Sequence, residues 1–87
     1  MGYSFKFTKR ALRELVHLPA SDQKRISQKL NFFISQKNIW LYAKPLVNLP
    51  PSTHRFRVGK LYRLSFHIAD IAIIIDRIEL RGRAYRR

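Results

Sequence analysis

The arginine and lysine side chains carry most of the potential chemistry of this sequence, and they are distributed unevenly along it. Residues 1–53 contain 3 Arg and 6 Lys, whereas residues 54–87 contain 8 Arg and 1 Lys. An arginine side chain is a planar fork that binds phosphate through two donors, whereas lysine is a point charge that suits a solvated surface. The arginine-rich half is therefore interpreted as a phosphate-binding set and the lysines as solubility charge. Solubility charge throughout is the alternative.

Several of these arginines occur at alternate positions, which indicates β-strands. Arg55 and Arg57 alternate with Phe56 and Val58, and Arg63 opens a similar alternation after a short turn. Because successive side chains of a strand point to opposite faces, the apolar residues are expected to face a core and the arginines an open sheet face. No acidic residue of this hairpin neutralises the cluster. It is interpreted as a polyanion site, with charge protection of a sheet edge as the alternative.

The composition limits the class of protein. The chain has 87 residues, which predicts a single domain over 1–87, and its 46% hydrophobic residues exclude a disordered basic tail. The absence of Cys excludes a disulfide scaffold, and the three His residues lack metal-ligand spacing, so no metal or cofactor is expected. The longest apolar run, residues 71–75, is too short to span a bilayer, and no signal peptide is evident, so a cytoplasmic location is expected.

The net charge is the strongest compositional signal. A formal charge of +13 destabilises a compact chain through self-repulsion, so an external anionic partner is expected. Nucleic acid, an anionic membrane and an acidic protein are the candidate partners.

The first half of the chain is predicted to form a strand and two helices. Residues 3–8 alternate as a strand, and Thr8 is placed to cap a helix whose apolar residues recur at helical spacing up to residue 16. A second helix is expected to begin at Ser21 or Asp22 and to carry one apolar stripe. A short link joins the helices, which predicts an antiparallel helical hairpin.

The second half is predicted to form a connection and three strands. Residues 38–53 contain three of the four Pro residues and read as a connection, in which Trp40 and Leu41 are expected to fill the core. Period-two alternation then predicts strands that start near residues 54, 62 and 71, separated by tight turns. The order β-α-α-β-β-β predicts a two-layer α+β domain, an antiparallel sheet with the helical hairpin packed on one face.

Four segments, taken in order, resemble the RelE toxins of the RelE/ParE toxin–antitoxin superfamily. They are residues 3–15 (YSFKFTKRALREL), 43–46 (AKPL), the hairpin 54–59 (HRFRVG) with 62–64 (YRL), and 80–85 (LRGRAY). They look like the first strand and helix of the family, the element before its second strand, its basic hairpin, and its closing arginine and tyrosine. The resemblance covers nearly the whole chain.

The resemblance implies a toxin of a type II toxin–antitoxin system, a ribosome-dependent mRNA endoribonuclease that cuts in the A site and arrests translation. It implies no metal, a ribose 2′-OH as the attacking group, and a 2′,3′-cyclic phosphate as one product. The implied partners are the small ribosomal subunit with its mRNA and an acidic antitoxin similar to RelB.

The predicted site residues form two groups, of which the resemblance assigns the catalytic one, while the basic tail contributes Arg83, Arg86 and Arg87 to the RNA-binding one. The catalytic group is Arg55, Arg57, Arg63, Arg81 and Tyr85, and the RNA-binding group is Lys44, Lys60, Arg83, Arg86 and Arg87. Arginines suit stabilisation of a phosphorane-like transition state but are poor bases, since their pKa lies above about 12. Tyr85 is expected to act as the base, because nearby cations lower the pKa of a phenol, or else to stack on a nucleobase. Leu80 stands where some relatives place a His that serves as acid or base.

Two other functions remain open on the same fold. One is a ParE-like inhibitor that binds DNA gyrase without cleaving RNA, although ParE-like chains generally lack the arginine set. The other is a catalytically inactive RNA-binding relative. The fold alone does not separate these functions, because function depends on the site.

Overall fold

The computed structural model describes residues 2–80 of the chain. In chain order its elements are β1 (Ser4–Phe7), α1 (Lys9–Val16), α2 (Ala20–Ser35), the 3-10 turn η1 (Ile39–Leu41), β2 (Ala43–Pro45), β3 (His54–Val58), β4 (Tyr62–Ala69) and β5 (Ala72–Leu80). None of the helices within this range is long and apolar enough to cross a membrane.

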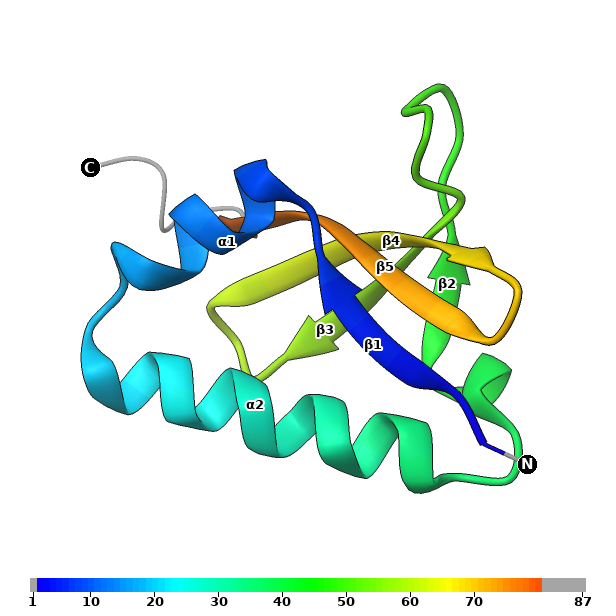
Figure 1. Cartoon of the computed structure of the whole chain (residues 1–87), viewed down its shortest axis with the longest axis horizontal. Helices are drawn as coiled ribbons and strands as arrows, with labels where there is room; N and C mark the ends of the chain where they lie inside the picture. The colour runs from blue at the N-terminus through cyan, green and yellow to red at the C-terminus, as the bar shows by residue number, and fades with distance from the viewer. Residues whose placement is uncertain (1, 81–87) are drawn as a thin grey trace.

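The strands form one five-stranded sheet in the order β1-β5-β4-β3-β2, which confirms the α+β class (Figure 1). The sheet is mixed, since β1 runs parallel to β5 while the other neighbouring strands are antiparallel. The expectation of an antiparallel sheet was therefore wrong at one edge. The chain leaves β1 through both helices and returns through the meander, so β5 arrives beside β1 in the same direction.

A fifth strand, β2, lies inside the segment that was predicted to be only a connection. It pairs antiparallel with β3 at the far edge of the sheet. It spans only Ala43–Pro45, too short to show a period of two, and it ends in a proline. Proline has no backbone N–H to donate, which an edge strand tolerates and a central strand does not.

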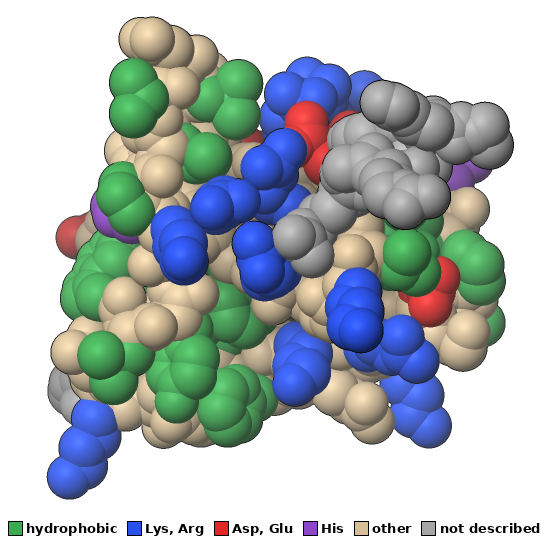
Figure 2. Space-filling model, turned by 180° about the vertical axis from the view of Figure 1, so that it is seen from behind, with side chains coloured by type: hydrophobic (Ala, Val, Ile, Leu, Met, Phe, Trp, Pro, Cys, Tyr) green, Lys and Arg blue, Asp and Glu red, His purple; other side chains and the backbone are tan. Residues whose placement is uncertain are grey.

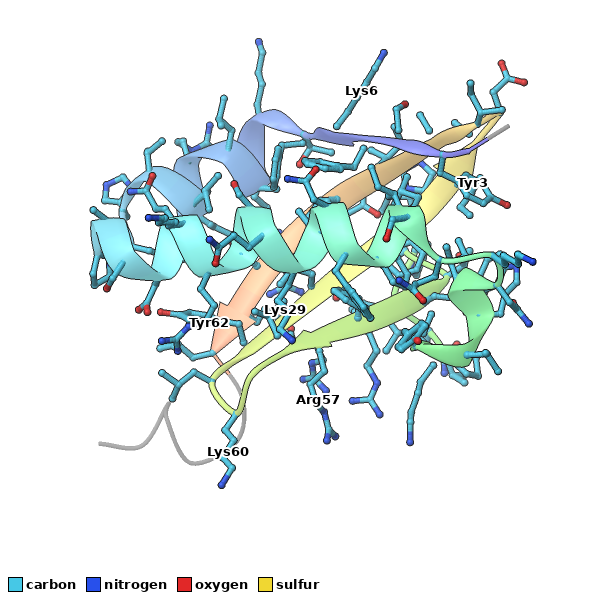
Figure 3. The ribbon with its side chains drawn as sticks, turned by 90° about the horizontal axis from the view of Figure 1, so that it is seen from below. Tyr3, Lys6, Lys29, Arg57, Lys60 and Tyr62 are labelled. Atoms are coloured by element: carbon cyan, nitrogen blue, oxygen red, sulfur yellow. The ribbon has the colours of Figure 1, made fainter. Side chains whose placement is uncertain are left out.

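One hydrophobic core lies between α2 and the sheet. Phe33 of α2 packs against Phe56 of β3 and Phe66 of β4, with ring centroids 3.9 and 5.8 Å apart. Figure 3 shows α2 crossing in front of the strands. The other helix, α1, comes directly after β1 and lies against β5 (Figure 1). The apolar residues of β3 and β4 therefore face the core as expected, and the sheet face turned away from α2 is called the open face below.

The two helices begin differently. The hydroxyl of Thr8 caps α1 as predicted: it accepts a hydrogen bond from the Ala11 N–H (3.1 Å) and donates one to the carbonyl of Asp76 (3.2 Å). The expected cap of α2 at Ser21 or Asp22 was wrong, because α2 begins directly after Pro19 without a side-chain cap. Proline is already restricted to a backbone angle φ that suits the start of a helix.

Trp40 and Leu41 do not fill the core. They are 45% and 75% exposed, whereas Ile39 is buried. The tight turn of η1 points Ile39 inward and leaves the next two side chains outside, where the Trp40 ring packs against His54 with centroids 4.6 Å apart. Trp40 therefore forms an exposed aromatic surface, although it was predicted to fill the core.

Asp22 ties α2 to the start of β4. Tyr62 is a buried residue, and its hydroxyl donates a hydrogen bond to the Asp22 carboxylate over 2.6 Å. Burial and then this hydrogen bond raise the pKa of Tyr62 from its ordinary value of 10.0 to about 12. The folded state therefore favours the protonated phenol.

Tyr62→Phe should destabilise the fold at neutral pH by about 1.5–3 kcal/mol, the usual contribution of a hydrogen bond to a charged group. A raised folded-state pKa means that this stabilisation is complete below pH 10 and is lost as the pH rises toward 12. Urea denaturation across this range should show the wild-type stability falling toward that of Tyr62→Phe. A difference between the two proteins that stays constant with pH would contradict this assignment.

Candidate functional site

The strand register places basic side chains opposite one another on the open face. Arg55 of β3 pairs with Lys44 of β2, and Arg57 of β3 pairs with Arg63 of β4. Directly opposed residues project to the same face of a sheet. The predicted sharing of one face by three arginines is therefore confirmed, and β2 adds a lysine.

These side chains line a pocket of about 170 Å³, called the cationic pocket. Its lining residues are Tyr42, Lys44, Arg55, Arg57 and Arg63. Figure 2 shows Lys and Arg side chains gathered in a band across this side of the molecule. The structure thus brings four of the ten sequence-predicted site residues to one concave surface and adds Tyr42, which the sequence analysis did not select.

Glu79 partly neutralises the pocket, which corrects the expectation of an uncompensated cluster. The register places it opposite Arg63, and its carboxylate lies 3.6 Å from the Arg63 Nε and also pairs with Arg77. That expectation rested on the hairpin of β3 and β4 alone, whereas Glu79 belongs to β5. Within residues 2–80, Lys44, Arg55 and Arg57 form no ion pair.

A bulge in β5 determines which of its side chains reach the open face. Ile75 is buried in the core, and strict alternation would direct Arg77 to the core as well. The register between β4 and β5 shifts here, so that Asp76 is an extra residue. Beyond it the alternation is reversed: Ile78 is buried, and Arg77 and Glu79 lie on the arginine side of the sheet.

Asp76 holds a second polar cluster apart from the cationic pocket. Its buried carboxylate accepts a hydrogen bond from the Ser52 hydroxyl (2.7 Å) and contacts Nδ1 of His67 (2.8 Å). The carboxylate lies between the hydroxyl and the ring, so the serine is not activated by histidine as in a hydrolase triad. His67 is therefore engaged by this carboxylate.

Among residues 2–80, one further predicted site residue, Lys60, does not line the cationic pocket. Lys60 lies in the turn between β3 and β4, and Figure 3 shows it projecting to the same side as Arg57, away from Lys6. The predicted residues Arg81, Arg83, Tyr85, Arg86 and Arg87 lie outside the described residues. The last described residue, Leu80, pairs with Tyr62 next to Arg63.

Comparisons with known proteins identify the fold. No family model matches the sequence, and no curated protein matches it. Among solved structures, the chain is similar to one from the RelE–RelB complex of the archaeon Pyrococcus horikoshii OT3, with 23% identity and a TM-score of 0.71 over 95% of this chain and 99% of that one.

Two further structures agree. A chain of the toxin–antitoxin complex RelBE2 from Mycobacterium tuberculosis is 29% identical, with a TM-score of 0.64 over 93% of this chain and 100% of that one. The isolated E. coli RelE toxin is 20% identical, with a TM-score of 0.69 over 95% of this chain and 90% of that one. The chain therefore has the RelE fold over nearly its whole length, and the resemblance to RelE-type toxins drawn from its sequence segments is confirmed.

Proposed function

We propose that this RelE-fold protein is the toxin of a toxin–antitoxin system and that it cleaves mRNA in the ribosomal A site. The observation that carries the proposal is the cationic pocket. Lys44, Arg55, Arg57 and Arg63 converge there from three adjacent strands. Four cationic side chains around one small pocket suit a phosphodiester, which carries one negative charge in the substrate and more in the transition state.

The proposed reaction is a transesterification within RNA. The ribose 2′-oxygen attacks the adjacent phosphorus, a new P–O2′ bond forms, and the P–O5′ bond breaks. The products are a 2′,3′-cyclic phosphate and a 5′-hydroxyl, and the 5′-oxygen takes up the proton that the 2′-hydroxyl releases. No metal is required by this scheme, because guanidinium groups supply the positive charge that stabilises the phosphorane.

The pocket supplies charge and leaves the proton transfer to other groups. An arginine does not act as a base at neutral pH, and no His, Asp or Glu is among the lining residues. We propose Tyr85 as the base or as a stacking residue, and Arg81 as a further cation that stabilises the transition state.

A gyrase-binding function has less support from this surface. Such a protein needs a protein interface, and four convergent cations around a pocket are not required for it. The observed arrangement instead fits recognition of phosphate along a single strand.

An acidic antitoxin is the second part of the proposal. The chain carries +13, and two of the similar structures come from toxin–antitoxin complexes of the RelE–RelB type. An acidic partner would neutralise this charge and block access to the cationic pocket. We place the system in the cytoplasm, where ribosomes are available.

Arg63→Ala and Arg81→Ala should each reduce cleavage by about 10²- to 10³-fold, the usual cost of removing one transition-state donor. Primer extension on programmed ribosomes measures the new 5′ ends at the A-site codon, and circular dichroism checks that the fold is retained. Lys6→Ala is the charge-matched control, because Lys6 is exposed on β1, at the sheet edge opposite β2, and projects to the side opposite Arg57 (Figure 3). Full activity of both arginine variants would refute the assigned site.

Binding to single-stranded RNA should weaken with salt, with a slope of log K against log salt of roughly −0.7 for each phosphate neutralised. Arg57→Ala should reduce the magnitude of that slope by about 0.7, whereas Lys6→Ala should not change it. Fluorescence anisotropy with a labelled oligonucleotide at several salt concentrations measures the slope. Equal slopes for wild type and Arg57→Ala would show that no RNA phosphate binds at Arg57 and would contradict the assignment.

Affinity purification of the chain expressed from its native operon should recover a small acidic protein in stoichiometric amount. Its addition to the ribosome assay should suppress cleavage. If purification recovers no acidic protein, or the recovered protein leaves cleavage unchanged, the antitoxin part of the proposal fails.

A further inference from the structure

An aromatic surface borders the cationic pocket. Phe32, Trp40 and Tyr42 are each 40–45% exposed near the end of α2 and in the segment that follows it. Figure 2 shows hydrophobic side chains gathered beside the band of Lys and Arg. Of these aromatic residues, Tyr42 is the one that lines the cationic pocket.

Contacts on several sides fix the Tyr42 ring. Its hydroxyl donates a hydrogen bond to the Gln36 side chain over 3.3 Å. The ring stands nearly perpendicular to those of Phe32 and Phe33, at centroid distances of 5.4 and 6.5 Å. Its backbone N–H donates to the Ile39 carbonyl over 3.0 Å. These contacts hold an exposed aromatic ring in one orientation before any ligand binds.

We propose that Tyr42 is a base-stacking residue and that the cationic pocket binds a whole nucleotide, phosphate and base together. The inference rests on the proposed function, which assigns only the phosphate contacts. The chemistry is complementary, because the basic side chains attract the phosphate while a rigid aromatic ring offers a surface to the base. The ligand is an unpaired, unstacked nucleotide of single-stranded RNA, since a base in a duplex already stacks on its neighbours.

The test uses a short single-stranded RNA and a set of matched RNAs, each with one abasic position. For wild type, the abasic change at the nucleotide bound by Tyr42 should weaken binding about tenfold, within the usual range for one base–aromatic stack. For Tyr42→Ala, the intact RNA should bind about tenfold more weakly than to wild type, and the same abasic change should have little further effect. Fluorescence anisotropy measures all of these affinities.

Three further variants separate stacking from packing. Tyr42→Phe keeps the aromatic ring, so its RNA binding should remain sensitive to the abasic position. Tyr42→Leu keeps an apolar contact with Phe33 but has no ring, so its RNA binding should no longer be sensitive to the abasic position. Trp40→Ala is the control, because Trp40 is exposed beside the pocket without lining it, and it should behave as wild type. Thermal melting checks that each variant folds.

The proposal is overturned if wild type is insensitive to every abasic position, if it binds no RNA, or if Tyr42→Leu stays as sensitive as wild type. Equal weakening of intact and abasic RNAs by Tyr42→Ala would also overturn it, because that pattern indicates a structural role. Ribosomes are absent from this experiment. A wild type that shows base-dependent binding but cuts no mRNA on ribosomes would refute the proposed function and leave the stacking inference intact.

Discussion

The register between β3 and β4 is the constraint on which the rest of the site depends. It places Arg57 directly opposite Arg63, a like-charge pair that destabilises the sheet by itself. The same register aligns Phe56 with Leu64 on the other face, where both side chains are buried. Burial of the apolar pair offsets the repulsion, and a slip of one residue would turn the arginines into the core. Packing in the core therefore keeps Arg57 and Arg63 next to each other despite their repulsion.

The remaining elements adjust this arrangement. The bulge at Asp76 reverses the alternation of side chains in the rest of β5, so that Glu79 of this strand reaches Arg63. One carboxylate orients that arginine without neutralising the whole pocket. On the other side, β2 adds Lys44 at the edge of the sheet, and the preceding turn brings Tyr42 to the same surface. The pocket is thus assembled from segments that are separate in the sequence and adjacent only in the sheet.

Sequence periodicity predicted the arginine face because alternation is a local property. Arg55, Arg57 and Arg63 could be assigned to one face without knowledge of the other strands. Glu79 could not, because its face depends on a bulge that leaves no mark in an apolar run. Tyr42 was missed for a related reason: a short 3-10 turn and a three-residue strand carry no readable period. The element order and the α+β class also followed from periodicity and turn signals, whereas the proposed reaction and the assigned catalytic residues came from the resemblance to a known family.

The central claim is that the cationic pocket stabilises attack by a ribose 2′-oxygen on the adjacent phosphate. The most direct measurement uses programmed ribosomes whose mRNA carries a single 2′-deoxy nucleotide on the 5′ side of the scissile bond. The account predicts that cleavage at this bond is abolished, while a matched all-ribose mRNA yields a 2′,3′-cyclic phosphate. Cleavage of the deoxy-substituted mRNA at an undiminished rate would show that a different nucleophile acts and would contradict the account.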